Sequence, residues 1–166
     1  MSLRAPSEGA LRIAIGAVAM AGLGVSGYLT AIRAAGNDPV CVIGGGCHTV
    51  QQSEYSELAG IPVAVLGLVA YATLLVAAIL PGPFGRALGL FTAVVGVGFS
   101  AWLTYAELVL IDAICAWCVS SAVLITLALV LTAWRAVRVG SDPGESADRS
   151  LPGHPPPEPS PRSSRG

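Results

Sequence analysis

The stretch Ile114-Cys115-Ala116-Trp117-Cys118 places two cysteines, separated by two residues, at the edge of an apolar run that covers residues 119–134. Two thiols at this spacing form a tight disulfide or hold a soft metal ion. At the N-terminus of a helix, the dipole and the free N–H groups also lower a thiol pKa and favour a reactive thiolate. The motif alone fits a structural disulfide equally well, so the position of the other two cysteines decides the interpretation.

The composition indicates a membrane protein. Of 166 residues, 54% are hydrophobic and only 11% are charged, and the mean hydropathy is +0.71. A soluble domain carries roughly 25% charged residues. The net charge is −1, which gives no reason to expect a nucleic acid as a partner.

Four apolar runs predict a bundle of four transmembrane helices, because a span needs about 20 apolar residues. The expected spans are residues 11–32, 61–80, 87–110 and 113–134, within an all-α transmembrane domain of residues 11–138. Four glycines in the first span indicate close approach of a neighbouring helix: Gly16, Gly22, Gly24 and Gly27. Residues 1–10 are a short polar N-terminus. Residues 139–166, rich in Pro, Ser, Gly and Arg, are expected to be a disordered tail.

The other two cysteines, Cys41 and Cys47, lie in the polar stretch of residues 33–60, with Gly44-Gly45-Gly46 between them. Three glycines make a pliant link, which suits cysteines that pair with different partners at different times. In the same stretch, residues 53–58 are expected to form a short helix along the membrane surface.

The distribution of arginines predicts the orientation of the spans. One set of flanks is arginine-rich and includes Arg4, Arg12, Arg86, Arg135 and Arg138. The two loops on the other side carry Arg33 against five acidic residues: Asp38, Glu54, Glu57, Glu107 and Asp112. The positive-inside rule therefore predicts that both termini are cytoplasmic. Glu107 and Asp112 lie near the tip of the last hairpin, either as polar groups of a binding site or simply as solvated hairpin ends.

This orientation brings all four cysteines to the outer, oxidising face, one pair on a loop and one at a helix end. Thiolate attack on a disulfide passes through mixed disulfides, so two neighbouring pairs can pass electrons along a line. No haem, flavin or metal-cage motif is present, and the cysteines with His48 lack the paired spacing of a zinc site. A quinone, which dissolves in the bilayer and takes two electrons, is the simplest acceptor.

At these residues the chain resembles the vitamin K epoxide reductase family, in its bacterial, quinone-reducing form without a fused thioredoxin domain. The resemblance covers roughly residues 10–134. Its pieces are Cys41-x5-Cys47, Ser53-x-Tyr55, Gly60-Ile61-Pro62-Val63-Ala64-x-Leu66-Gly67 and Cys115-x-Trp117-Cys118. The other bacterial class of disulfide-oxidising quinone reductases places its C-x-x-C in the first outer loop, whereas here it comes last.

The resemblance implies a role for each cysteine. Cys115 and Cys118 would be the redox pair, with Cys118 facing the quinone ring, and Cys41 would shuttle by pairing with Cys115. Cys47 would be the sulfur that a reduced partner attacks. Of two further residues, Ser53 would support the loop over the site, and Trp117 is a candidate for contacting the quinone, or else an interfacial tryptophan.

The implied activity is that of a membrane thiol:quinone oxidoreductase in the bacterial inner membrane, driving disulfide formation in secreted proteins. Its electron donor would be a separate extracytoplasmic thioredoxin-fold disulfide carrier. Ala122 stands where the animal enzymes have a tyrosine, so the expected acceptor is a respiratory quinone, menaquinone or ubiquinone.

Two interpretations of other kinds remain open at this point. A non-catalytic four-span membrane protein with structural disulfides would keep both cysteine pairs permanently oxidised. A metal sensor or transporter would bind metal through four thiolates, but the sequence lacks the intramembrane charges that ion pathways usually have.

Overall fold

The computed structural model describes residues 7–41 and 45–139, most of which lie in four long helices. These are α1 (Glu8–Ala34), α3 (Val63–Ile79), α4 (Gly82–Tyr105) and α5 (Ala116–Val139). A π-helical turn, η2 (Ala106–Ile111), extends α4. Between α1 and α3 lie α2 (Cys47–Gln51), the 3-10 turn η1 (Glu54–Ser56), and the strands β1 (Glu57–Leu58) and β2 (Ile61–Pro62).

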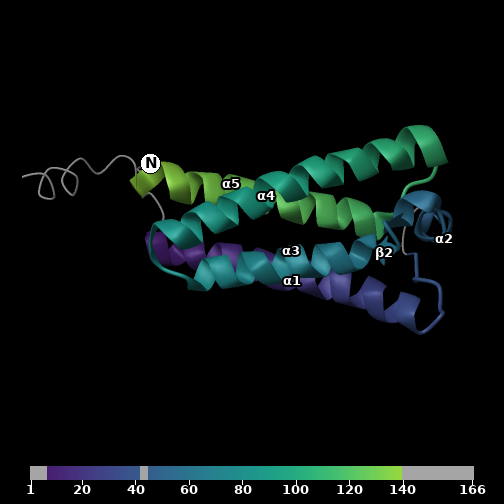
Figure 1. The fold of residues 1–166 in the computed structure, drawn as a ribbon, viewed down its shortest axis with the longest axis horizontal. Helices are drawn as coiled ribbons and strands as arrows, with labels where there is room; N and C mark the ends of the chain where they lie inside the picture. Colours follow the sequence, from purple (N-terminus) through teal and green to yellow (C-terminus); the bar gives the residue numbers. More distant parts are fainter. Residues whose placement is uncertain (1–6, 42–44, 140–166) are drawn as a thin grey trace, which may run out of the picture.

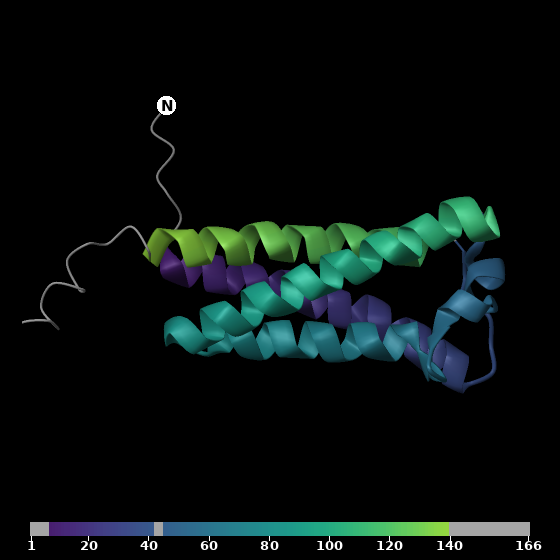
Figure 2. The ribbon, with the colours of Figure 1, turned by 45° about the horizontal axis from the view of Figure 1, so that its top comes forward.

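The long helices lie side by side, and the short elements gather at one end of them (Figures 1 and 2). The start of α1 and the end of α5 lie at the other end. We call the end with α2 and β2 the loop end and the opposite end the terminal end. The expected tail of residues 139–166 lies almost entirely outside the described residues, as does most of the polar N-terminus.

Within the described residues, three helical segments are long and apolar enough to cross a membrane: α1, α4 together with η2, and α5. The fourth long helix, α3, is apolar but has 17 residues, which gives a length of about 25 Å. Large apolar side chains are exposed along the outside of the helices, among them Ile13, Phe91, Val94, Val123 and Val137. Such a surface suits lipid, because soluble proteins rarely expose so much contiguous apolar area.

Small residues bring the helices close together. Ala19, Ala93 and Ala128 are fully buried in the central core, where they pack with Tyr71 and Leu74. At Gly22, a Cβ atom would lie 2.2 Å from the ring of Tyr71, so this position requires glycine. Of the other glycines in α1, Gly16 and Gly27 have ordinary van der Waals neighbours, and Gly24 faces open space. The predicted close approach is therefore confirmed at Gly22 and wrong at Gly24.

Two arginines bind the C-terminal end of α3 at the terminal end of the bundle. Arg12 donates from Nε to the Ala78 carbonyl at 2.7 Å and also to the Ile79 carbonyl. Arg135, 2% exposed, donates to the carbonyls of Ala77 and Leu80 at 3.0 and 3.3 Å. The last carbonyls of a helix have no partner within it, so these bonds satisfy groups that would otherwise be unpaired.

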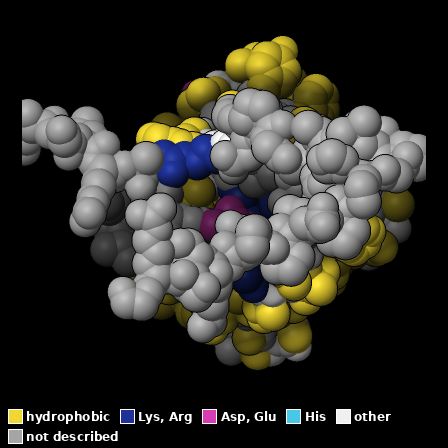
Figure 3. Space-filling model, turned by 90° about the vertical axis from the view of Figure 1, so that its left-hand side faces the viewer, with side chains coloured by type: hydrophobic (Ala, Val, Ile, Leu, Met, Phe, Trp, Pro, Cys, Tyr) yellow, Lys and Arg dark blue, Asp and Glu magenta, His cyan; other side chains and the backbone are white. Residues whose placement is uncertain are grey.

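Arg135 also forms an ion pair with Glu8, at 2.8 Å from its Nε. Figure 3, viewed from the terminal end, shows basic and acidic side chains close together with hydrophobic side chains around the outside. The ion pair joins α1 to α5, so the two arginines tie three helices together at this end.

The short helix expected over residues 53–58 is wrong. Only the turn η1 is helical, and the chain then forms a two-residue antiparallel hairpin in which Glu57 pairs with Pro62. The hairpin turn uses two left-handed residues, Ala59 with φ 53° and Gly60 with φ 79°, a conformation that matches the twist of paired strands. Because β2 takes Ile61 and Pro62, α3 begins at Val63.

A single arginine ties this loop to α1. Arg33 donates to the Gln51 carbonyl at 2.9 Å and to Ser56 Oγ at 3.2 Å, and it pairs with Glu57 at 2.5 Å. These contacts hold the segment from Gln51 to Glu57 against α1, at the end of the bundle where the cysteines lie.

Candidate active site

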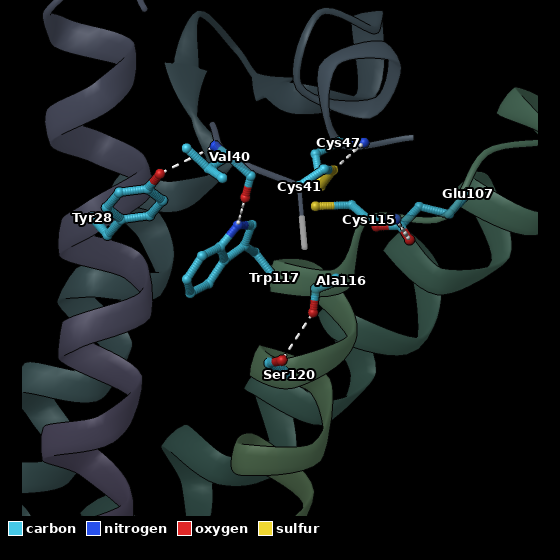
Figure 4. The surroundings of a disulfide bond; sticks show 9 residues. All are labelled: Tyr28, Val40, Cys41, Cys47, Glu107, Cys115, Ala116, Trp117 and Ser120. Atoms are coloured by element: carbon cyan, nitrogen blue, oxygen red, sulfur yellow. Dashed lines mark hydrogen bonds between the residues drawn. A yellow bond between two sulfur atoms is a disulfide. The ribbon is translucent and has the colours of Figure 1, made fainter. Parts of the chain in front are cut away.

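The four cysteines belong to one cluster at the loop end. Cys47 and Cys115 are fully buried in it with Val50, and Cys41 and Cys118 pack against them. Cys41 and Cys47 form a disulfide with their Cα atoms 5.9 Å apart, whereas Cys115 and Cys118 are free thiols. Figure 4 shows the Cys115 side chain directed toward the disulfide. A thiol and a disulfide in such contact are the two reactants of an exchange reaction.

The backbone of the loop pair lies directly against the segment that leads to Cys115. A Cβ atom on Gly46 would lie 2.7 Å from the Ile114 carbonyl oxygen and 2.9 Å from its nitrogen. No larger residue fits there without separating the two segments. One residue later α2 begins, and the N–H of Cys47 donates to the Cys41 sulfur at 3.1 Å.

Cys115 lies at the N-terminus of a long helix. It immediately precedes α5, and its carbonyl accepts the Val119 N–H at 3.0 Å, the first hydrogen bond of the helix. A hydrogen bond from the Cys118 thiol, helped by the N–H groups of Cys118 and Trp117, lowers the pKa of Cys115 to about 7, against burial and the nearby charge of Glu107. At neutral pH about half of such a thiol is thiolate, the nucleophilic form.

The turn that precedes Cys115 contains a buried carboxyl group. Glu107 in η2 is 4% exposed, and its Oε2 accepts the Cys115 N–H at 3.2 Å. The Cys118 thiol also interacts with this carboxyl group, and the two residues line the same cavity. The main-chain carbonyl of Glu107 accepts the N–H of Asp112 and, at 3.1 Å, the N–H of Ala113.

Of the two alternatives for the acids of this hairpin, Glu107 is therefore buried beside the thiols, whereas Asp112 is a solvated hairpin end. The reason lies in the backbone: η2 is wound with π-helical bonds and Asp112 is left-handed, with φ 52°. Together they turn the chain back so that Glu107 faces inward to Cys115. Sequence reasoning did not select Glu107 as a site residue, because a π-helical turn leaves no signature in the hydrophobic periodicity. Such turns are nevertheless frequent at functional sites.

A cavity of about 520 Å³ adjoins Cys118, and it opens to the outer surface of the bundle at exposed wall residues such as Phe91 and Val95. One face of α5 contributes Cys118, Ser121 and Ile125, at the three- and four-residue spacing of a helix. Apolar side chains of α3 and α4 form much of the remaining wall, among them Leu66, Phe91, Val95 and Leu103. Glu107 lines the same cavity, and the hydroxyl of Tyr71 donates to the Ser121 carbonyl at 2.9 Å in its wall. The size and lining are those of a site for a small, largely apolar molecule.

Trp117 contacts the segment that carries Cys41. Its Nε1 donates to the Val40 carbonyl at 3.0 Å, and its ring packs against Tyr28 with a centroid distance of 4.8 Å. The Tyr28 hydroxyl in turn accepts the Val40 N–H at 3.1 Å, as Figure 4 shows. The residue before Cys41 is thus bonded on both sides, and Trp117 also lines the cavity.

Ser53 lies at the other edge of the loop. Its hydroxyl donates to the Val50 carbonyl at 2.7 Å, just beyond α2, and the residue lines the cavity. The two loop cysteines differ in access, because Cys47 is fully buried and Cys41 is half-buried. A protein thiol can reach Cys47 only after this part of the loop has moved.

Comparison with known proteins relates this arrangement to disulfide chemistry. The chain is 44% identical over 45 residues to the thiol-disulfide oxidoreductase LTO1 of Arabidopsis thaliana. This alignment covers 26% of the chain and only 12% of that larger protein. The sequence pattern of the vitamin K epoxide reductase family matches residues 13–133, which contain all four cysteines, Glu107 and the cavity, and the chain therefore belongs to the vitamin K epoxide reductase family.

Proposed function

We propose that this membrane thiol-disulfide oxidoreductase passes electrons from a reduced, extracytoplasmic thioredoxin-fold carrier to a quinone. Two electrons leave the carrier dithiol, pass through Cys47 and Cys41 and then Cys115 and Cys118, and reduce menaquinone or ubiquinone to the quinol. The carrier leaves as a disulfide, which it can pass to secreted proteins. The observation that carries the proposal is the contact of a disulfide with a free dithiol whose second thiol adjoins an apolar cavity.

Each transfer is an exchange of one sulfur–sulfur bond. A carrier thiolate attacks Cys47 and releases Cys41, and Cys41 then attacks Cys115 when the latter is bonded to Cys118. The resulting Cys41–Cys115 link releases the Cys118 thiol, and Cys47 resolves it by restoring the loop disulfide once the carrier has left. In this scheme, an oxidised Cys41–Cys47 pair beside the reduced Cys115 and Cys118 thiols is the stage before electrons reach the quinone.

The residues around the cavity fit a quinone. A flat, apolar ring with two oxygens needs apolar walls and few polar groups, and the cavity has Phe91, Val95 and Ile125 on its walls and Glu107 as its buried acid. A quinone bound there would act as the two-electron acceptor. Cys118 supplies the sulfur nearest to it, and Trp117 is placed to touch both the ring site and the Cys41 segment.

The proposed membrane arrangement has four spans, with α3 as the short one, in a bacterial inner membrane. The terminal end carries Arg12 and Arg135, so the positive-inside rule favours a cytoplasmic position for it and for residues 1–10 and 139–166. The loop end then faces the oxidising compartment, where disulfides persist.

The test is quinol formation by purified protein in detergent, with dithiothreitol as electron donor and a short-chain ubiquinone as acceptor. We expect Cys118→Ala to abolish the reaction, because no other sulfur at the cavity can receive electrons from Cys115. Ser120→Ala is the matched control, since its hydroxyl is exposed on the same helix and bonds only within it to the Ala116 carbonyl. Near-normal turnover by Cys118→Ala would refute the assigned role. Inactivity of the wild-type protein would favour structural disulfides.

A further inference from the structure

Glu107 is a buried acid without a positive partner among the residues that the structure describes. The ion pairs formed among the described residues are Arg33–Glu57, His48–Asp38 and Arg135–Glu8, and none of them includes Glu107. Burying a carboxylate away from water is costly unless other groups compensate for it. An acid kept in such a place, in a cavity and beside thiols, is a candidate for a functional group.

The titratable groups around Glu107 are the two thiols of the redox pair. Cys115 and Cys118 both interact with its carboxyl group. From α2, which packs against η2, the titratable residues are Cys47, held in the disulfide, and His48, which is exposed and directed to Asp38 at 3.3 Å. Asp112 is exposed at the end of the same turn. Glu107 is therefore the acid that links the redox pair to the cavity.

We propose that Glu107 is a catalytic proton relay, whose carboxylate accepts the proton of the Cys118 thiol and delivers it to the bound quinone. The inference rests on the proposed function and assigns its proton path. It uses the geometry of the site: Glu107 and Cys118 line one cavity, and the bond from the Cys115 N–H holds the carboxyl group beside the redox pair.

The step balances in atoms and electrons. Oxidation of the dithiol releases two electrons and two protons, and reduction of a quinone to a quinol takes up the same number. Glu107 takes the proton of Cys118, the Cys118 sulfur gives up its electrons as it bonds to Cys115, and Glu107 then passes its proton to a quinone oxygen. Cys115 releases its own proton to solvent, and solvent supplies the second proton to the other quinone oxygen. Glu107 ends each cycle as it began.

The other role available to Glu107 is to hold the turn through the Cys115 N–H. Glu107→Gln separates the two roles, because the amide oxygen still accepts this N–H but the amide cannot take up a proton. We expect Glu107→Gln to reduce quinol formation by about 100-fold or more, in the range of general acid–base catalysis, with the KM for ubiquinone unchanged. Glu107→Asp should retain an intermediate rate, because it keeps a carboxyl group but places it farther from the Cys118 sulfur and the quinone. Asp112→Asn, which changes the exposed acid of the same turn and tolerates its left-handed backbone, should stay within twofold of wild type.

A second readout needs no quinone. If Glu107 is ionised at rest, its charge raises the pKa of Cys115, so Glu107→Gln should move the pH midpoint of Cys115 alkylation by iodoacetamide downward, by about half a pH unit or more. This midpoint is measured on the reduced protein by mass spectrometry, and it reports whether Glu107 is ionised at rest, which the relay requires.

The outcomes separate the inference from the proposed function. A Glu107→Gln protein that reduces ubiquinone within threefold of wild type overturns the relay and leaves the quinone reductase intact. A slow variant with an unmoved Cys115 midpoint also overturns the relay, since a carboxyl that is protonated at rest cannot accept a proton. A wild-type protein that forms no quinol overturns the proposed function itself.

Discussion

The two ends of the helix bundle each bury one charged side chain, and they treat it differently. Arg135 at the terminal end is 2% exposed, and its donors are bonded to Glu8 and to two main-chain carbonyls. Glu107 at the loop end is 4% exposed, and its partners are one N–H and a thiol. The full pairing of Arg135 indicates a structural role. Glu107 is buried to the same extent but lies beside reactive thiols and has no counter-ion among the described residues, which indicates a catalytic role.

The neighbours of the two residues support this contrast. Arg135 and Arg12 bind groups that never react, the last carbonyls of α3. Glu107 lies among groups that can change state, the thiols of Cys115 and Cys118. We therefore expect substitutions at the terminal end to affect stability, and substitutions at the loop end to affect the rate of electron transfer.

The largest effect on stability is expected from Arg135→Met. The change keeps apolar bulk but leaves the Ala77 and Leu80 carbonyls without these donors and removes the ion pair to Glu8. The free energy of unfolding should fall by about 2–4 kcal/mol. It can be followed by denaturation in mixed micelles, while turnover per folded molecule stays within twofold of wild type. An Arg135→Met protein with unchanged stability but slow turnover would contradict the assignment of a structural role to the terminal end.

The next effect concerns the reactivity of Cys115. Because the Cys118 thiol is the main cause of its low pKa, Cys118→Ala should raise the pKa of Cys115 from about 7 toward its ordinary 9.0. The thiolate fraction at pH 7 would then fall from about one half to about one per cent, and alkylation would slow by roughly 50-fold. The pH profile of iodoacetamide labelling in the reduced protein measures the midpoint, with Ser120→Ala as control. A midpoint that stays near 7 would assign the low pKa to the N-terminus of α5 alone.

The sequence was sufficient wherever a short pattern determines the local structure. The C-x-x-C motif lies at the start of α5, and Gly22 admits the ring of Tyr71. The cysteine motifs identified the family, because their order and spacing along four apolar runs are specific.

The sequence was insufficient wherever one residue depends on the path of a distant segment. The burial of Glu107 results from the π-helical turn and the left-handed Asp112, whose bonds close over five and six residues. The hairpin at Glu57 and Pro62 likewise replaced an expected helix, because Arg33 and the paired strands fix the loop there. Contacts of this kind decide which acid enters the site, and local periodicity does not contain them.

A smaller effect is expected where the two cysteine segments touch. Gly46→Ala adds a methyl group where the Ile114 backbone leaves no space, so the Cys41 and Cys115 segments should move apart. In a Cys47→Ala/Cys118→Ala background, which leaves one possible link, we expect the Cys41–Cys115 disulfide to form about tenfold more slowly, in line with the cost of overpacking. Non-reducing electrophoresis after timed quenching follows the link, and Thr49→Ala, at an exposed position of α2, is the control. An unchanged rate would show that this close contact does not limit the exchange.

The smallest effect separates the two possible roles of Trp117. Trp117→Phe keeps an aromatic ring but removes the Nε1 donor to the Val40 carbonyl, and Tyr28→Phe removes the hydroxyl that accepts the Val40 N–H. If both residues position the Cys41 segment, each variant should form the Cys41–Cys115 link two- to fivefold more slowly, which corresponds to the net value of about one hydrogen bond. The KM for the short-chain ubiquinone should be unchanged in both. A raised KM in Trp117→Phe, with normal link formation, would instead make Trp117 part of the quinone site, and the loop end would then hold its acceptor with the same helix turn that carries its thiols.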